Sequence, residues 1–276
     1  MIWHVHKHLE ILHDNHHMLG LRGSISIVVL LWSIFFTAAS ADSLPATLER
    51  IRGSVVAIGT VTPVLHASAK KPNAKFVGTG FVIGNGRQVI TNYHVIPSKI
   101  DDKHNESLAV FSGRGQLALP RKAKVIRLDK DHDLALLEID GPKMPVIQLE
   151  NGNAVKEGQD VAFTGFPLGM ALGMYPVTHK TIISAITPVV IPANSSRKLT
   201  AAQIKRLKTP YEVFQLDSIA YPGNSGSPVY RIDTGKVIGI VNSVFVKGTK
   251  ESMLKTPSGI SYAIPVRYIH KILDGS

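Results

Sequence analysis

Short apolar runs separated by glycine, proline and asparagine turns fill this chain from Ser54 onward, and they limit its fold more than any other feature. Runs of this length and composition, bounded by turn residues, are typical of β-strands. The predicted strands cover residues 55–58, 76–83, 88–91, 108–111, 123–128, 134–139, 161–164, 180–186, 211–216, 228–230, 237–246 and 260–264. Helices are predicted only over 44–52, 200–207 and 266–273. The pattern therefore indicates an all-β protein that ends in a short helix.

The segments between the strands suggest how the chain is divided. Gly84-Asn85-Gly86 is a hairpin signal between two predicted strands. Residues 63–75 are polar and rich in small side chains, which predicts a loop, and residues 141–145 have the composition of a crossing segment. We therefore expect one domain over 42–276, with two halves that meet near residue 145.

A serine lies in the glycine-rich segment Gly223-Asn224-Ser225-Gly226-Ser227-Pro228, between two apolar runs. Such a segment permits a tight turn that presents a hydroxyl together with backbone N–H groups. Acyl transfer needs this combination, because the hydroxyl attacks a carbonyl and the N–H groups stabilise the oxyanion that forms. The segment predicts Ser225 as nucleophile and an oxyanion hole built from Gly223, Asn224 and Ser225, in which the N–H groups of Gly223 and Ser225 face the oxyanion.

Two upstream segments supply the other groups of a catalytic triad. His94 stands at the end of an apolar run, and Asp133 heads another. The order His, Asp, Ser is one of the chain orders in which Ser-His-Asp triads occur. Asp131 is the alternative for the acidic position. Asp217, eight residues before Ser225, is expected to be a buried structural carboxylate rather than part of a pocket.

Taken together, these segments resemble the chymotrypsin-like serine peptidases, and within them the trypsin-like peptidase domain of HtrA-type proteases. The matching pieces follow the family's order and cover residues 78–83, 91–96, 133–137, 165–169, 223–228, 237–240 and 259–265. The turn at 223–229 is also similar to that of the glutamyl endopeptidases. No PDZ module, which HtrA-type proteases usually carry, is expected in this sequence.

The resemblance implies a two-barrel chymotrypsin-like fold, with barrels over about 42–145 and 146–276. It implies an endopeptidase that hydrolyses peptide bonds through an acyl-enzyme, with Ser225 as nucleophile and His94 as general base and then acid. Asp133 would fix the imidazole tautomer, and it is preferred over Asp131 because it directly precedes the run 134–137, as the family's aspartate does. Protein or peptide substrates are the expected partners, and no cofactor or metal is expected.

The resemblance also places the specificity pocket. The residue six positions before the serine would form its base, and here that residue is Ile219, which has no carboxylate and so argues against a preference for Lys or Arg. Val241 stands where the glutamyl endopeptidases have a histidine, which argues against glutamate preference. The expected lining is Ile219, Ala220, Asn242, Ser243, Val244 and Ile260. This apolar pocket favours small or medium aliphatic side chains.

Composition limits the remaining possibilities. The 276-residue chain has no cysteine, which excludes disulfides, a cysteine nucleophile and thiolate metal sites. Its net charge of +11 favours anionic surfaces, but no nucleic-acid-binding motif accompanies it, and a solvated basic face is the preferred interpretation. Binding to an anionic surface stays a second alternative function. A protease-like binding or scaffold protein, with an unassembled or regulated triad, is the first.

The N-terminus has the features of an export signal. Residues 25–39 carry no charge and are mostly apolar, and Ala39-Ser40-Ala41 fits a small-residue cleavage site. A signal peptide over 1–41 predicts export to the bacterial periplasm or outside the cell, without stable membrane insertion after cleavage; an uncleaved anchor is the alternative. The residues from Met18 onward would form a compact signal peptide by themselves, so we hypothesise that translation starts at Met18. The alternative is that the six histidines before Met18 form a metal-binding segment.

Overall fold

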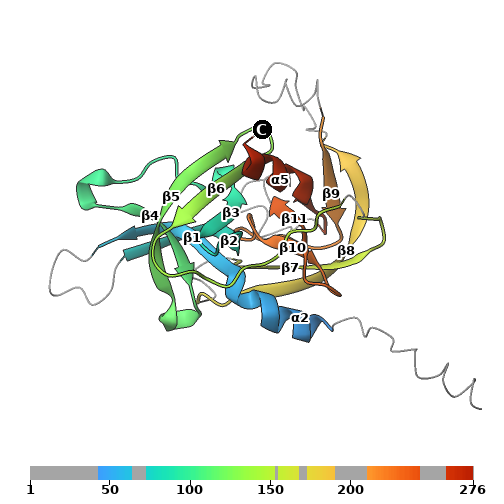
Figure 1. Cartoon of the computed structure of the whole chain (residues 1–276), viewed down its shortest axis with the longest axis horizontal. Coiled ribbons are helices and arrows are strands. Elements are labelled where there is room, and N and C mark those ends of the chain that lie inside the picture. Colours follow the sequence, from blue (N-terminus) through green and yellow to red (C-terminus); the bar gives the residue numbers. More distant parts are fainter. Residues whose placement is uncertain are drawn as a thin grey trace, which may run out of the picture. The chain divides into compact units, whose positions relative to one another are not determined.

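Two closed antiparallel β-barrels form the molecule, and the polypeptide completes one before it begins the other (Figure 1). The computed structural model describes residues 43–63, 73–152, 155–167, 173–189, 210–242 and 259–275, all within the unit Asp42–Ser276. The first barrel contains β1 (Val55–Thr62), β2 (Asn73–Ile83), β3 (Gln88–Asn92), β4 (Ser107–Ser112), β5 (Leu119–Asp129) and β6 (Leu134–Ile139). The second contains β7 (Asp160–Gly165), β8 (Val177–Pro188), β9 (Glu212–Leu216), β10 (Pro228–Arg231), β11 (Val237–Asn242) and β12 (Ser261–Pro265).

The two barrels share one topology. Around the first barrel the order is β1-β2-β3-β6-β5-β4, and around the second it is β7-β8-β9-β12-β11-β10 when read from β7. The fold is thus a structural repeat, although the sequences of the two halves show no convincing repeat. This arrangement confirms the predicted all-β, two-barrel chymotrypsin-like fold.

The helices in the described residues are few and short. They are α2 (Leu44–Ile51), α5 (Val266–Asp274) and the single 3₁₀ turns η1 (Arg52–Ser54), η2 (Tyr93–Val95), η3 (Asp102–His104) and η4 (Gly115–Leu117). The predicted N-terminal and C-terminal helices are confirmed. The predicted helix over 200–207 and the end of the predicted strand over 237–246 lie outside the described residues.

Some predicted boundaries are wrong. The loop predicted over 63–75 is too long at its C-terminal end. Strand β2 already begins at Asn73, which pairs with Thr62 of β1. β5 begins at Leu119 and β8 at Val177, several residues before the predicted starts. The added residues are mostly exposed or half-buried, so they lack the apolar signature by which a strand is found in a sequence.

Apolar side chains fill both barrels and also the space between them. In β2, Val82 belongs to the core of the first barrel, whereas Phe81 and Ile83 belong to a cluster shared with Ile240 and Ile264 of the second barrel. Side chains alternate between the two faces of a strand, so a strand that is buried on both faces is apolar at every position. This explains why the strands between the barrels appear as continuous apolar runs in the sequence.

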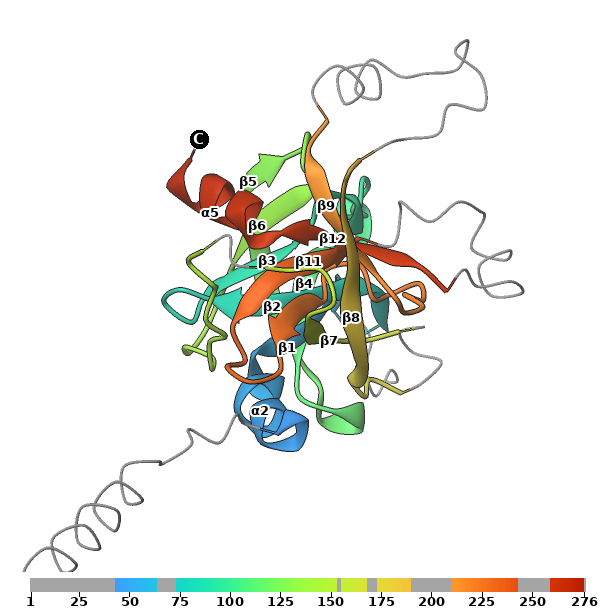
Figure 2. The same cartoon turned by 90° about the vertical axis from the view of Figure 1, so that its right-hand side faces the viewer.

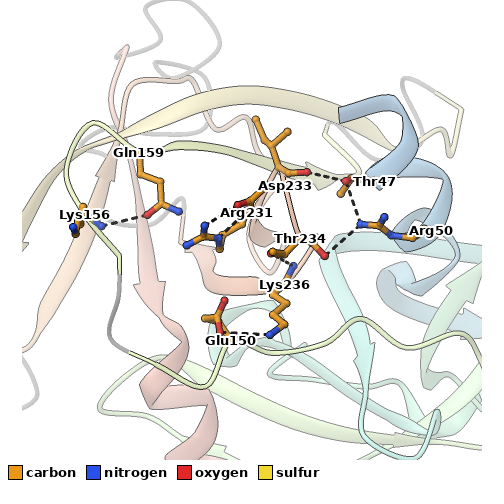
Figure 3. Close-up of polar contacts among 10 residues, drawn as sticks. Thr47, Arg50, Glu150, Lys156, Gln159, Arg231, Asp233, Thr234 and Lys236 are labelled. Carbon is orange, nitrogen blue, oxygen red and sulfur yellow. Dashed lines mark hydrogen bonds and ion pairs between the residues drawn. The ribbon is translucent and has the colours of Figure 1, made fainter. Parts of the chain in front are cut away.

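The helices at the two ends of the described chain each contact the barrel that is distant in sequence (Figures 1 and 2). Helix α2 precedes the first barrel but lies on the β10–β11 turn of the second, where Thr47 Oγ1 donates to the Ile232 carbonyl at 2.8 Å (Figure 3). Helix α5 follows the second barrel and contacts β5 and β6 of the first, where Arg127 donates to the Ile272 carbonyl at 2.9 Å. The two helices therefore fasten the barrels to each other.

Candidate active site

Three side chains from both barrels meet in a line of short hydrogen bonds. His94 lies on η2, directly after β3, and its Nδ1 is 2.6 Å from Asp133 Oδ2. Its other ring nitrogen, Nε2, is 2.8 Å from the Oγ of Ser225, which stands in the turn before β10. Because a carboxylate only accepts hydrogen bonds, Nδ1 carries the ring hydrogen and Nε2 is left to accept the serine hydroxyl.

The pairing of β3 with β6 brings His94 beside Asp133. Asn92 pairs with Leu134, and the Asp133 carbonyl accepts hydrogen bonds from the Tyr93 N–H at 3.0 Å and the Asn92 amide at 3.1 Å. These bonds hold Asp133 at φ 56°, a left-handed conformation that is uncommon for a residue with a side chain. The carboxylate is thereby aimed at His94 rather than at solvent.

The Asp133 carboxylate is buried and accepts three hydrogen bonds. Oδ1 accepts the backbone N–H of His94 at 3.0 Å, and Oδ2 accepts both His94 Nδ1 and the side-chain amide of Asn242 at 2.6 Å. A buried charge is tolerable where several donors satisfy it. Asp131, the alternative for the acidic position, is exposed.

A second histidine steadies the turn that carries Asp133. His132 Nδ1 lies 2.6 Å from Asp129 Oδ2, and the His132 ring stacks on Tyr268 of α5 with a centroid distance of 4.2 Å. Burial acts to raise the pKa of the Asp129 carboxyl, but its hydrogen bonds to His132 outweigh burial and lower it. The turn is therefore tied to the C-terminal helix one residue before Asp133.

The glycine-rich turn before β10 is tightly folded. Gly223 has φ 99°, and the Asn224 N–H donates to the Tyr221 carbonyl at 2.9 Å. The Asn224 N–H is therefore bonded within the turn, and Asn224 separates the two residues whose N–H groups are the predicted oxyanion donors, Gly223 and Ser225. Ser225 itself is only 4% exposed, and its hydroxyl lies within reach of His94.

Gly226 allows this turn to approach the first barrel. A Cβ atom at Gly226 would lie 1.8 Å from the carbonyl oxygen of Thr79, and its φ of 89° also favours glycine. Gly165, which ends β7, is similarly confined, because a Cβ there would lie 1.9 Å from Ser227 Oγ. Both glycines are required by close packing around Ser225.

The residues predicted to line a specificity pocket have different environments. Ile219 is half-buried, Ala220 is buried and Ile260 is 41% exposed. Asn242 directs its amide to Asp133, and its place in the pocket wall stays a prediction. Ser243 and Val244 lie outside the described residues.

The segment that leads to Ile219 is held by residues that the sequence pattern did not single out. The Asp217 carbonyl accepts the Thr181 hydroxyl at 2.8 Å, and the Ser218 carbonyl accepts the Ser261 hydroxyl at 2.8 Å. The prediction that Asp217 is a buried carboxylate is wrong, because this residue is exposed. Only its backbone is engaged in fixing the segment.

Two features of the described residues bear on the alternatives of a metal site and a membrane anchor. No group of three or more His, Asp or Glu side chains among them is arranged to hold a metal ion. None of the helices formed by these residues has the length and apolar character needed to cross a membrane. The six histidines before Met18 and the predicted signal peptide over 1–41 lie outside this part of the chain.

The chain is similar to bacterial serine endoproteases. It is 30% identical over 225 residues to a probable periplasmic serine endoprotease DegP-like of Pseudomonas savastanoi pv. phaseolicola, and the match covers 82% of this chain and 40% of that protein. Proteins of the same description in Pseudomonas fluorescens and Chlamydia pneumoniae are 32% and 29% identical, over 71% and 76% of this chain and 34% and 36% of theirs. The chain thus spans less than half the length of these relatives.

A solved structure and a family model agree with this similarity. The crystal structure of the serine endoprotease from Yersinia pestis matches with a TM-score of 0.55 and 22% identity, over 84% of this chain and 66% of that one, which supports the fold. The model of the trypsin-like peptidase domain matches residues 78–240, a range that contains His94, Asp133 and Ser225. This chain therefore belongs to the family of trypsin-like peptidase domains.

Proposed function

We propose that this chain is a serine endopeptidase in which Ser225, His94 and Asp133 act as the catalytic triad. One observation carries the proposal: an unbroken line of hydrogen bonds joins the three side chains across the two barrels, at 2.6 Å and 2.8 Å. A histidine placed between a buried carboxylate and a serine hydroxyl can accept and return a proton. The serine endoprotease descriptions of the relatives support the same reaction.

Each step of peptide hydrolysis has a group to perform it. Ser225 Oγ attacks the substrate carbonyl while His94 Nε2 takes the hydroxyl proton, and the N–H groups of Gly223 and Ser225 stabilise the oxyanion of the tetrahedral intermediate. His94 then gives the proton to the leaving amine, which leaves an acyl-enzyme. A water molecule, deprotonated by His94, attacks the acyl carbon, and His94 then returns this proton to Ser225 Oγ as the bond between that oxygen and the acyl carbon breaks and the carboxylic acid product leaves. Asp133 keeps the imidazole oriented and stabilises its protonated form.

The proposed substrates are proteins or peptides with a small or medium aliphatic residue before the cleaved bond. Ile219 and Ala220 contribute apolar side chains to the segment that precedes Ser225, and Ile260 lies on the neighbouring part of the chain before β12. None of these three side chains can pair with a charged substrate residue. Discrimination among aliphatic residues is modest, since one methylene is worth about 1–3 kcal/mol in an apolar pocket.

We also propose that the protein acts outside the cytoplasm, in the periplasm or beyond it. The predicted signal peptide over 1–41 and the periplasmic descriptions of the relatives support this. N-terminal sequencing of the exported protein tests the cleavage after Ala41. A Met18→Ala expression test shows where translation begins.

A fluorophosphonate probe tests the catalytic proposal directly, because it reacts only with an activated serine. The purified protein is expected to be labelled at Ser225, and Ser225→Ala is expected to lose both labelling and casein hydrolysis while it folds normally. His94→Ala should be comparably inactive, and the double variant should lose little more, because triad members act as a unit. A folded protein that neither reacts nor hydrolyses would favour the scaffold alternative.

A further inference from the structure

Thr79 of β2 places its polar atoms on the turn that carries Ser225, although the two belong to different barrels. Its backbone N–H donates to the Ser225 carbonyl at 2.8 Å. Its hydroxyl donates to the Gly223 carbonyl at 2.7 Å and accepts the Phe166 N–H at 2.9 Å. Thr79 is completely buried, so these bonds do not compete with solvent.

These contacts fix two peptide units of the turn at both ends. The peptide between Gly223 and Asn224 has its carbonyl on the Thr79 hydroxyl and its N–H on the Tyr221 carbonyl. The peptide between Ser225 and Gly226 has its carbonyl on the Thr79 N–H and its N–H on the Val241 carbonyl. A peptide plane that is bonded at both ends cannot rotate without breaking two hydrogen bonds.

The peptide between these two carries the N–H of Ser225, and it is also held. The Asn224 carbonyl accepts the Ser227 N–H at 3.0 Å. The N–H of Gly223 belongs to the preceding peptide, which joins the first anchored plane at Gly223 itself, where φ is 99°. The positions of both proposed oxyanion donors therefore depend on planes that Thr79 anchors.

Local strand geometry explains why Thr79 is available for this role. Pairing of β2 with β3 runs from Ile83 back to Phe81 and stops there, two residues after Thr79. The turn takes the place of the missing strand pairing, since the Thr79 carbonyl faces Gly226 so closely that a Cβ would lie at 1.8 Å. The same carbonyl accepts the Thr91 hydroxyl at 2.7 Å, which ties it to β3.

We infer that Thr79 is a positioning residue that holds the turn 223–226 in the shape required for oxyanion stabilisation. This inference rests on the proposed serine endopeptidase activity. The hydroxyl matters in particular, because it joins the start of the segment after β7, at Phe166, to Gly223 through one oxygen atom. A purely structural threonine would affect the stability of the fold but not the rate of the chemical step.

The test compares kcat, KM and the melting temperature of Thr79→Val and Thr79→Ser on a peptide amide with valine before the cleaved bond. Thr79→Val keeps the shape and removes the hydroxyl. Loss of a direct oxyanion donor lowers kcat about 100- to 1,000-fold, so we expect a smaller fall, of about 10- to 100-fold, from an indirect one. KM should change less than about 3-fold, because ground-state binding is retained. Thr79→Ser should stay within about 3-fold of wild-type kcat, since it keeps the hydroxyl.

Thr60→Val is the matched control, because Thr60 is a buried strand threonine whose hydroxyl donates to Glu106 at 2.6 Å, a contact outside the triad. It should lower the melting temperature and leave kcat nearly unchanged. A Thr79→Val variant with wild-type kcat would overturn the inference, as would a Thr79→Ser variant whose kcat falls more than about 10-fold. If Thr79→Val does not fold, Thr79→Ala, which also removes the hydroxyl, replaces it with the same expected fall in kcat. Failure of the wild-type protein to react with fluorophosphonate would instead refute the proposed activity.

Discussion

The side-chain amide of Asn242 lies 2.6 Å from the Asp133 carboxylate and joins the last residue of β11 in the second barrel to the turn before β6 in the first. It reaches the same oxygen, Oδ2, that contacts His94. The second barrel therefore supplies two groups to the site. Ser225 contacts Nε2 of His94, and Asn242 donates to Asp133, which contacts Nδ1. The alignment of the three side chains therefore depends on how the two barrels are docked.

Replacement of Asn242 should reduce activity. Asn242→Ala removes a hydrogen bond to a charged group, worth about 1.5–3 kcal/mol, so kcat is expected to fall by about 10- to 100-fold if the loss acts on the transition state. Asn242→Asp should fall further, because it sets a second carboxylate against the first. Exposed Asn151→Ala is the control. Steady-state kinetics of Asn242→Asp that match wild type would contradict this role.

Two glycines with positive φ should respond differently to alanine. Gly158 has φ 80° and nothing lies within 4 Å of its missing Cβ, so Gly158→Ala should cost only the left-handed conformation, about 1–2 kcal/mol. Gly226 has φ 89°, but its Cβ would overlap the Thr79 carbonyl at 1.8 Å. Gly226→Ala should therefore be destabilised well beyond Gly158→Ala in urea unfolding and should lose activity. Equal unfolding midpoints for the two variants would show that the turn can move away from β2.

The pH dependence of stability should report on Glu106. The Thr60 hydroxyl, the Asp101 N–H and Lys75 hold the Glu106 carboxylate in its charged form and lower its pKa from 4.5 to about 2. Because the pKa of Glu106 is lower in the folded state, its charged carboxylate stabilises the fold at pH values above 4.5, the pKa in the unfolded chain. This contribution disappears as the pH falls toward 2. Glu106→Gln should thus be less stable than wild type at pH 7, with the gap closing between about pH 4.5 and 2.

Exposed Glu49→Gln on α2 is the control for Glu106→Gln, because it removes a surface carboxylate. Its unfolding free energy should follow wild type across the same pH range. A stability difference between wild type and Glu106→Gln that does not change with pH would indicate that packing, rather than charge, explains the effect.

The sequence predicted the strands and the candidate triad because both are local patterns. Ser225 is recognised from its glycine-rich turn, and His94 and Asp133 from their positions beside apolar runs. The sequence does not reveal the outer strand segments in which polar residues are paired, as in the match of Lys75 with Thr60 across β1 and β2. Backbone pairing of this kind leaves no hydrophobic alternation in the sequence.

The supporting residues of the site could not be predicted, because their partners are distant in the chain. The Thr79 hydroxyl and the Gly223 carbonyl are 144 residues apart, and Asn242 and Asp133 are 109 apart. In the sequence, Thr79 is one strand threonine between two glycines. Its role follows only from how the second barrel docks on β2, which no local pattern encodes.

Substrate profiling should show a preference for apolar residues before the cleaved bond, and one acidic substitution at Ile219 should change this preference. Peptides with Val, Ala, Ile or Leu before the cleaved bond should be cut faster than those with Lys, Arg, Glu or Asp. Ile219→Asp should raise cleavage after Lys and Arg by about 10-fold or more, because an opposite charge at the pocket base contributes on the order of 1–3 kcal/mol. Leu117→Asp, at a position that is 81% exposed, is the control. A wild-type profile dominated by charged residues would contradict the proposed pocket.

The contact of α2 with the second barrel should contribute measurably to stability. Thr47 is fully buried, and its hydroxyl is the donor to the Ile232 carbonyl, whereas Arg50 is exposed and reaches the Thr234 carbonyl at 3.3 Å (Figure 3). Thr47→Val leaves the Ile232 carbonyl without this donor, which should cost about 1–3 kcal/mol in urea unfolding. Arg50→Ala should cost less than about 0.5 kcal/mol, as surface substitutions usually do. If both variants unfold at the wild-type midpoint, α2 does not fasten the barrels, and their docking depends on the apolar cluster between them and on α5.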